Sequence, residues 1–479
     1  MLGIIALVAF VTALDNTVVA TAAPSIAADL RLGLAATQWI TLGYMLPFAG
    51  LLLTTGTIVD RYGAGVVLRV GLAAFGGGAL LAGGTRSEAL LITARVLQGA
   101  AAALLVPATL SLVRNNLPER RRQAGAATWT AALAAALAAG PVVGGAISQY
   151  FGWSWIFFSN VPFALAGLLL AIGLPTAPAR ADERINARGM LLAALTMVFG
   201  TAALVGLGDH RAYGPVPWTV FAAAAVLGAT VFVLEDRRSA RPIIPSTLLR
   251  RRFFTGGLVI QVLWGLGVSG VFFFTPLVHQ RWLGLAPGAA ALPLVAVAVA
   301  LVLATPFVGG AVRRLGPGVA VAAGLFAVAA GLFAIAMVNH IPEVAPRIPG
   351  LVLIGAGSAF TVPLTTCALD VVSEEQSGIA SGVLTAGREF SSALGVALIG
   401  AVLATVSAVG ATTATDTGVT GLPAARSLAD GYTVGLLVAA ALELLAALLT
   451  LAVFGRRVVV PGGSAQARPA QRVSAIDAG

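Results

Sequence analysis

The chain has 479 residues, of which 58% are hydrophobic and 10% are charged, and its mean hydropathy is +0.95. This composition excludes an ordinary soluble globular protein, in which about a quarter of the residues are charged. The sequence contains no lysine, so all 29 basic residues are arginines and the net charge is +10. Mechanisms that need a lysine, such as a Walker A phosphate loop or a Schiff-base cofactor, are therefore excluded.

About fourteen apolar stretches of roughly 18–25 residues follow one another, each long enough to cross a hydrocarbon core about 30 Å thick as a helix. We predict spanning helices at Leu2–Ala23, Gln38–Val59, Val66–Gly84, Ala89–Val113, Ala124–Ile147, Trp155–Leu174, Gly189–Leu207, Pro217–Leu234, Phe254–Val278, Ala289–Val312, Gly318–Val338, Pro349–Val372, Gly378–Ser407 and Tyr432–Phe454. Although small residues follow it, we expect the first stretch to be a retained helix and not a cleaved signal, because no basic residue precedes it and Asp15 interrupts it. A helix that begins almost at Met1 is unusual, so we expect a short cytosolic tail before it.

The arginines are concentrated in alternate connecting segments. If both termini are cytoplasmic, most arginines are cytoplasmic too, as the positive-inside rule requires. We interpret the runs Arg120–Arg122, Arg237–Arg238 and Arg250–Arg252 as anchors near anionic lipid and not as a nucleic-acid surface. Heavy use of Ala, Gly and Arg is typical of a GC-rich bacterial genome, so we expect a multi-pass protein of the bacterial inner membrane.

Two helix-rich segments flank a pair of helices bounded by charged loops. We predict an N-terminal six-helix bundle at 1–175, two linker helices with their loops at 176–252, a C-terminal six-helix bundle at 253–455 and a disordered cytoplasmic tail at 456–479. A faint repeat supports this division. Gly56-Thr-Ile-Val-Asp-Arg-Tyr-Gly63 follows the second helix, and Gly309-Gly-Ala-Val-Arg-Arg-Leu-Gly316 follows the second helix of the later half. Parallel halves of six helices are an established transporter plan.

Five motifs carry a resemblance to a known family. They are Leu14-Asp15-Asn-Thr-Val-Val in the first helix, Gln38-Trp39 with Tyr44 in the second, the segment Gly56 to Gly63 after it, Arg95-Val-Leu-Gln98-Gly99 in the fourth helix and Gly140-Pro141-Val-Val-Gly144-Gly145 in the fifth. In this order they resemble the major facilitator superfamily, and within it the fourteen-helix drug:proton antiporter family. The resemblance covers nearly the whole chain. It implies an all-α integral membrane fold of two pseudo-symmetric six-helix bundles plus two additional central helices.

Asp15 and Arg95 are the first candidates for proton coupling. At 1.5 Å per residue both lie roughly 10 Å below the outer surface, so they can pair. An ionised side chain near mid-membrane costs at least ~2.5–3.5 kcal/mol and usually faces a wet cavity. We interpret Asp15 as a proton carrier or cation contact, and the alternative is a helix-packing hydrogen bond. Gln98 shares a helix face with Arg95, and the resemblance implies that Arg95 communicates with the protonation site, whereas the alternative is a structural ion pair.

Two further carboxylates lie inside predicted helices. Arg388 and Glu389 fall near mid-depth of the thirteenth helix among serine and threonine residues, which makes Glu389 a second candidate proton site. The alternative is a local pair that neutralises itself. Glu443 stands alone near the middle of the last helix and is either functional or a neutral packing residue.

Gly56, Asp60, Arg61 and Gly63 are candidate gating residues. We expect Asp60 to lie in a short cytoplasmic turn, and the resemblance implies that this loop latches the two halves through charge contacts. The start of the thirteenth helix, around Ser377-Gly378, is the expected contact, because a helix N-terminus favours an anion. An ordinary turn cap is the alternative. The later copy has Arg313 at the acidic position, so we expect no matching latch there.

Gly140, Pro141, Gly144 and Gly145 are the second group of gating candidates. The glycines are expected to let helices approach closely, and the proline to bend the fifth helix where the halves rock apart. Packing of small residues alone is the alternative.

These observations predict a monomeric secondary transporter, not an enzyme, that exports drugs, antibiotics or related small amphiphilic molecules by proton-driven alternating access. Its expected partners are the small-molecule substrate, protons and membrane lipids, with no nucleic acid. We expect no cofactor and no metal, because Cys367 is the only cysteine and the three histidines are scattered. Aromatic residues such as Trp39, Tyr44 and Trp264 are expected to contact an apolar or cationic substrate. A non-transporting sensor of the same fold and a nutrient importer stay open as alternatives, and the sequence does not name the substrate.

Overall fold

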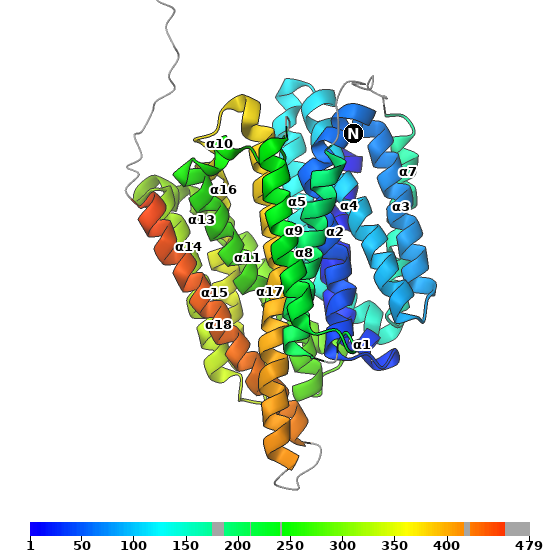
Figure 1. Ribbon diagram of the computed structural model, residues 1–479, viewed down its shortest axis with the longest axis vertical. Coiled ribbons are helices and arrows are strands. Elements are labelled where there is room, and N and C mark those ends of the chain that lie inside the picture. The colour runs from blue at the N-terminus through cyan, green and yellow to red at the C-terminus, as the bar shows by residue number, and fades with distance from the viewer. Residues whose placement is uncertain (175–185, 211, 240–241, 416–421, 456–479) are drawn as a thin grey trace, which may run out of the picture.

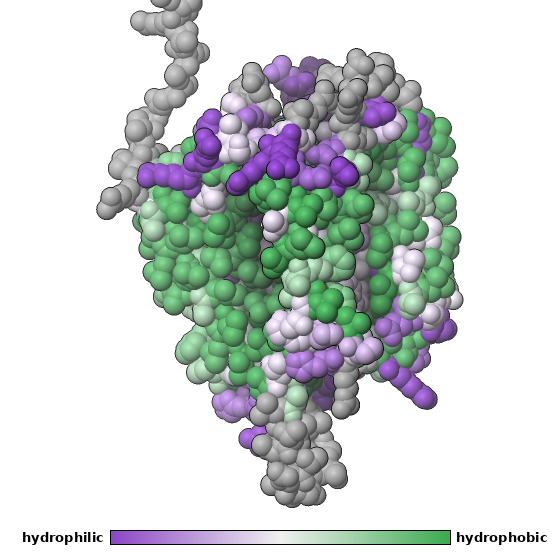
Figure 2. Space-filling view, viewed as in Figure 1, coloured by the Kyte–Doolittle hydropathy of each residue, from purple (hydrophilic) through white to green (hydrophobic). Residues whose placement is uncertain are grey.

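The structure is a computed structural model that describes residues 1–174, 186–210, 212–239, 242–415 and 422–455. In these residues every regular element is a helix, and fourteen spans are long and apolar enough to cross a membrane. The spans stand side by side in one bundle (Figure 1), with an apolar belt between two polar ends (Figure 2). The predicted all-helical fold is confirmed. The tail that we predict to be disordered, 456–479, lies outside the described residues.

The first six spans form the N-terminal half. They are α1 (Leu2–Asp29), α2 (Leu34–Tyr62), α3 (Ala64–Gly84), α4 (Glu88–Asn116), α5 (Glu119–Tyr150) and a broken span made of α6 (Ser154–Phe158) and α7 (Asn160–Ala171). In this half α1 packs against α5, while α4 packs against both α2 and α3.

The last six spans form the C-terminal half, which the short helix α10 (Ser246–Leu249) precedes. They are α11 (Arg252–Trp282), α12 (Pro287–Ala291) with α13 (Leu294–Leu315), α14 (Pro317–Val338), the 3-10 turn η1 (Ala345–Arg347) with α15 (Ile348–Ala359) and α16 (Val362–Leu369), α17 (Glu374–Thr415) and α18 (Leu422–Phe454). Here α11 packs against α17 and α18, and α14 packs against α18.

Three spans that the sequence predicts as single helices are broken, and proline explains each break. The sixth span breaks at Ser159, the tenth at Leu292-Pro293 and the twelfth at Phe360-Thr361. A proline lies at or within three residues of each break, and its ring clashes with the preceding turn of a helix. By contrast, α5 continues through Pro141 as one helix. Other helices, such as α1 and α17, run past their apolar stretches, because hydropathy marks the membrane and not the helix ends.

The predicted repeat is also a structural one. Gly63 joins α2 to α3 and Gly316 joins α13 to α14, and both have a positive φ, 84° and 82°. A side chain is strained in this conformation, which explains glycine at both turns.

One close contact between helices occurs in both halves. Gly99 of α4 packs against the backbone carbonyl of Tyr44 in α2, and Gly355 of α15 packs in the same way against the carbonyl of Val297 in α13. The two halves therefore place corresponding helices in corresponding contact.

Two linker helices, α8 (Ala187–Gly208) and α9 (Trp218–Arg238), lie between the halves in sequence. Gly50 of α2 meets Ala194 of α8, and Gly208 of α8 meets Ala401 of α17. Thus α8 contacts both halves, whereas α9 packs on α8 and Asp236, near its end, is its one buried residue.

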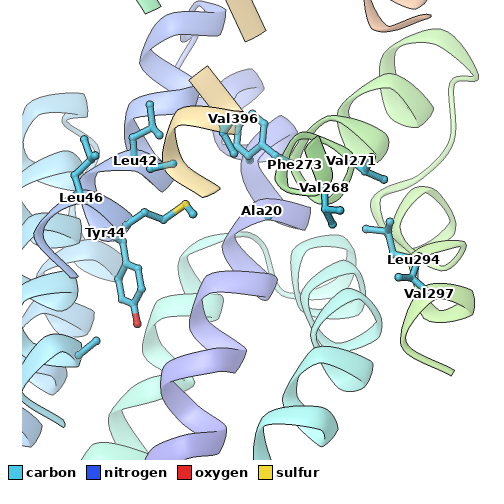
Figure 3. Packing of buried hydrophobic residues seen from close by; sticks show 14 of the residues in the cluster. Ala20, Leu42, Tyr44, Leu46, Val268, Val271, Phe273, Leu294, Val297 and Val396 are labelled. Atoms are coloured by element: carbon cyan, nitrogen blue, oxygen red, sulfur yellow. The ribbon is translucent and has the colours of Figure 1, made fainter. Parts of the chain in front are cut away.

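The two halves share one apolar core. Ala20, Leu42, Val268, Phe273 and Val396, from α1, α2, α11 and α17, belong to a single buried cluster (Figure 3). Because this cluster joins helices of both halves, it holds the candidate site residues of α1, α2 and α17 near one another.

The bundle has two distinct ends. α1 begins and α18 ends at the same one (Figure 1). We call it the arginine-rich end, because the helix ends and connections there carry Arg61, Arg114, Arg120–Arg122, Arg237–Arg238, Arg250–Arg252 and Arg313–Arg314. The opposite end is called the far end below.

Candidate functional site

A buried ion pair joins α1 to α4. Arg95 Nη1 lies 2.5 Å from Asp15 Oδ2, and both side chains are completely buried. Removing one member of such a pair leaves an uncompensated charge in an apolar interior, which costs about 3–5 kcal/mol. The pairing expected from the depth of the two residues is confirmed.

Two amides complete the surroundings of the carboxylate. Asp15 Oδ1 accepts a hydrogen bond from Asn160 Nδ2 at 2.6 Å and one from Gln98 Nε2 at 3.4 Å, while Arg95 Nη1 also donates to Gln98 Oε1 at 3.0 Å. Gln98 therefore shares the network of Arg95 as predicted. Asn160 is not among the residues predicted for the site. Its signal in the sequence is an amide inside an apolar span, which the break at Ser159 places at the start of α7.

The guanidinium of Arg95 is also held by α2. Its Nε donates to the carbonyl of Ile40 at 3.1 Å, and its Cζ lies 4.5 Å from the centre of the Tyr44 ring. The Tyr44 hydroxyl in turn donates to the carbonyl of Thr12 at 3.1 Å. Among the described residues no partner lies within hydrogen-bond distance of Arg95 Nη2, so one donor of this arginine is unsatisfied.

A second ion pair lies in α17. Arg388 donates to Glu389 Oε1 from Nη2 at 2.7 Å and from Nε at 3.2 Å, and the two side chains are 41% and 15% exposed. Thr385 and Ser392 beside them are also partly exposed. Since polar side chains at this depth avoid lipid, this face of α17 is the candidate wall of an aqueous cavity.

The two ion pairs approach each other around α2. The helices that carry these pairs, α1, α4 and α17, all pack against α2. One turn and a half before Tyr44, the Gln38 side chain donates from Nε2 to the carbonyl of Val396 in α17 at 3.0 Å. The predicted site residues of the two halves therefore come together, one pair sealed and the other partly open.

The glycines of α5 each have a separate partner toward the far end. Gly140 packs against Thr17 and Gly144 against Thr21, which holds α1 close to α5. Gly145 meets the second half, since a Cβ placed on it would lie 2.8 Å from Gly288 Cα of α12. The predicted close approach of helices at these glycines is confirmed.

A sequence profile described as Major Facilitator Superfamily matches residues 5–396. The chain belongs to this superfamily.

Similar proteins and structures agree with this assignment. Over 400 residues the chain is 31% identical to the tetracenomycin C resistance and export protein of Streptomyces glaucescens, which covers 82% of this chain and 73% of that protein. Over 412 residues it is 32% identical to the multidrug efflux pump LfrA of Mycolicibacterium smegmatis, with 84% and 80% covered. A crystal structure of the peptide transporter POT in complex with sulfate has a TM-score of 0.69 at 14% identity and covers 94% of each chain, which shows the shared fold. The protein is a multi-pass membrane transporter.

In this major facilitator transporter the loop motif lies mostly inside a helix. Gly56, Asp60 and Arg61 belong to α2, which ends at Tyr62, so the expectation that Asp60 occupies a turn is wrong. The reason is that α2 continues beyond its apolar stretch, and the turn itself is formed by Gly63. The partner helix α17 begins at Glu374, before Ser377-Gly378. Asp60 is exposed at this end of the bundle, and the latch stays a prediction.

The remaining candidates of the transporter are placed as follows. Tyr44 is a buried core residue, whereas Trp39 and Trp264 are partly buried. Cys367 is buried in α16, and Glu443 is buried completely within α18. Within the part of the chain that the structure describes, no group of three or more His, Cys, Asp or Glu side chains is arranged to hold a metal ion.

Proposed function

We propose that this transporter exports drugs, antibiotics or similar small amphiphilic molecules in exchange for protons. The observation that carries the proposal is the Asp15–Arg95 pair, fully buried inside the bundle and supplied with donors by Gln98 and Asn160. Ionisable groups at membrane depth are expensive and mark transport or proton pathways. The names of the similar proteins, a resistance and export protein and an efflux pump, support the outward direction.

Protonation of Asp15 removes the charge balance between Asp15 and Arg95. When Asp15 takes up a proton, Arg95 loses its counter-charge in an apolar interior, and a buried unpaired charge costs several kcal/mol. A rearrangement that gives Arg95 another partner or water is then favoured. This is how proton uptake at Asp15 drives the change between conformations.

Glu389 has the complementary position. Its side chain is partly exposed on the polar face of α17, whereas Asp15 is sealed. We assign proton exchange with water in this conformation to Glu389, and proton exchange at Asp15 to the conformation in which the far end opens. Each proton moving inward supplies about 2.3 kcal/mol per 100 mV and about 1.4 kcal/mol per pH unit.

The direction of the cycle follows from the two ends. In a bacterial inner membrane the arginine-rich end faces the cytoplasm, as the positive-inside rule requires. The start of α1 and the end of α18 are therefore on the cytoplasmic side. We interpret the contact of Gly145 with Gly288 as the closed far end, so in the proposed cycle the cavity receives substrate from the cytoplasmic side. The protein works as a monomer, since one chain contains both halves of the cavity.

Everted membrane vesicles test the proposal with ethidium as the probe. Wild-type vesicles are expected to accumulate ethidium when energised and to lose it when an uncoupler is added. Asp15→Asn and Glu389→Gln are each expected to lower accumulation about tenfold or more, because the lost charge contact exceeds the ~1.4 kcal/mol of a tenfold change. Glu235→Gln, which removes an exposed carboxylate paired with Arg188, is the matched control and should pump normally.

The outcomes separate the alternatives. Normal proton-driven uptake by both acid variants would refute the assignment of the coupling residues. An importer would expel the probe from energised everted vesicles, and a sensor would move it in neither direction.

A further inference from the structure

Glu443 is an acid without a partner inside the C-terminal half. Its side chain is 0% exposed, and among the described residues neither carboxyl oxygen has a hydrogen-bond partner. It faces α11, because a Cβ placed on Gly267 would lie 2.5 Å from Glu443 Oε1. Unsatisfied buried polar groups are rare in folded proteins, so this carboxyl needs an explanation.

In the internal repeat, this carboxyl occupies the position in the C-terminal half that corresponds to Asp15 in the N-terminal half. α1 and α11 are corresponding first helices, and each contains one proline, Pro24 and Pro276. Asp15 precedes Pro24 by nine residues, and Gly267 precedes Pro276 by nine. Gly267 is therefore the counterpart of Asp15, and the carboxyl that fills its place comes from α18.

The partners of Asp15 have no polar counterparts in this half. Gly99 and Gly355 correspond, and the residues four positions before them are Arg95 and Leu351. Leu351 is a buried leucine, so no arginine approaches the second carboxyl from α15. The N-terminal half thus holds an ion pair where the C-terminal half holds a single acid.

No charged group of the packed helices compensates Glu443. α14 and α16 contain no titratable side chain except Cys367, and Arg347 caps carbonyls at the far end of the half. The charges of α11, Arg252, His279 and Arg281, lie near its ends, and those of α18, Arg426 and Asp430, lie more than three turns from Glu443. On α17 the guanidinium of Arg388 is paired with Glu389, and the atom of Arg388 that lies near Gly265 of α11 is its backbone carbonyl oxygen.

An ionised carboxylate in such surroundings costs several kcal/mol, so the carboxyl carries its proton in this conformation. We propose that Glu443 is a third proton-binding site of the transporter, beside Asp15 and Glu389, which releases its proton when α11 and α18 shift and takes up another in the next cycle. The proposal rests on proton-coupled export. The step is a simple gain and loss of one proton at the carboxyl, and one carboxylate forms and disappears in each cycle.

Infrared titration of the purified protein tests the site without any substrate. The carbonyl band of a protonated carboxyl that disappears in Glu443→Gln belongs to Glu443. We expect this band in the wild type to decrease reversibly as pH is raised through the range in which the protein pumps. A band that is constant over this range would mean a permanently neutral packing residue and would overturn the proposal.

Proteoliposomes test the role in coupling, again with ethidium. If Glu443 carries one proton per cycle, the steady accumulation ratio that a pH difference of one unit supports falls about tenfold in Glu443→Gln. Glu443→Asp keeps the carboxyl and is expected to restore the wild-type ratio, which also covers the case in which the glutamine variant does not fold. Thr450→Val removes another buried polar group of α18 and should change neither readout.

An unchanged ratio in a folded Glu443→Gln protein, even with a titrating band, would overturn the role in coupling. If instead the wild type moves no ethidium in response to protons, proton-coupled export fails, while the infrared titration still decides whether Glu443 exchanges protons.

Discussion

Gly145 of α5 lies against Gly288 of α12, and the Gly288 N–H donates to Gln149 Oε1 of α5 at 3.3 Å. Of the three glycines in the motif of α5, it is the one whose nearest neighbours belong to the other half. Two glycines in contact bring no side chain between the helices, so in the proposed cycle this contact is the one that closes the far end.

Gly145→Val is expected to prevent that closure. The added side chain meets backbone atoms of α12, which cannot rotate away as a long side chain does. An impermeant maleimide should label Thr21→Cys from outside several-fold faster in this background, and ethidium export should fall. Gly77→Val in α3, where nothing lies within 4 Å of a new Cβ, is the matched control. Equal labelling in both backgrounds would contradict a closing role.

Arg95→Gln is expected to destabilise the transporter strongly. It leaves the Asp15 charge buried and unpaired, so we expect a loss of about 3–5 kcal/mol in the free energy of unfolding in detergent. Adding Asp15→Asn to this variant should restore part of that loss, because the stranded charge disappears. Strictly additive losses in the two single variants and the double variant would show that the residues do not interact.

Asn160→Leu is expected to have a smaller effect of the same kind. The variant removes the 2.6 Å hydrogen bond to Asp15 but leaves the ion pair, and hydrogen bonds to charged groups are worth about 1.5–3 kcal/mol. The same unfolding measurement should place it between the wild type and Arg95→Gln. A loss as large as that of Arg95→Gln would mean that Asn160 also has a packing role.

We expect the stabilising contribution of Tyr213 to be lost at alkaline pH. It lies in the connection between α8 and α9, its hydroxyl accepts a hydrogen bond from Trp39 Nε1 at 3.1 Å, and burial raises its pKa to about 12. The unfolded chain has the ordinary pKa of 10.0, so the contribution of Tyr213 is present below pH 10 and is lost as pH rises toward about 12. In a Tyr213→Phe variant, Tm should therefore fall less steeply over this range. Parallel curves for the two proteins would argue against the assignment.

The sequence predicts the parts of this protein that composition and spacing control directly. The pairing of Asp15 with Arg95 follows from their depths, because a helix rises by a constant amount per residue. Gly63 and Gly316 were matched by their position after the second helix of each half, and only a glycine fits both turns well.

Other features depend on neighbours that the linear sequence does not identify. Asn160 contacts Asp15 from the start of α7, after the break in the sixth span. Asp60 lies in α2 because that helix extends beyond its apolar stretch. Gly145 and Gly288 meet only after the two halves have packed together. Each of these outcomes is set by tertiary contacts, which override local pattern.

The contacts of α8 with both halves have a consequence for the lipid around the transporter. Gly50 meets Ala194 near one end of this helix, and Gly208 meets Ala401 near the other, so small residues touch at both places. Such surfaces slide and tilt over one another without interlocking side chains. Because α8 packs on both α2 and α17, which also pack on each other, the extra hairpin covers one side of the junction between the halves, and the apolar surface that faces lipid there belongs to α8 and α9.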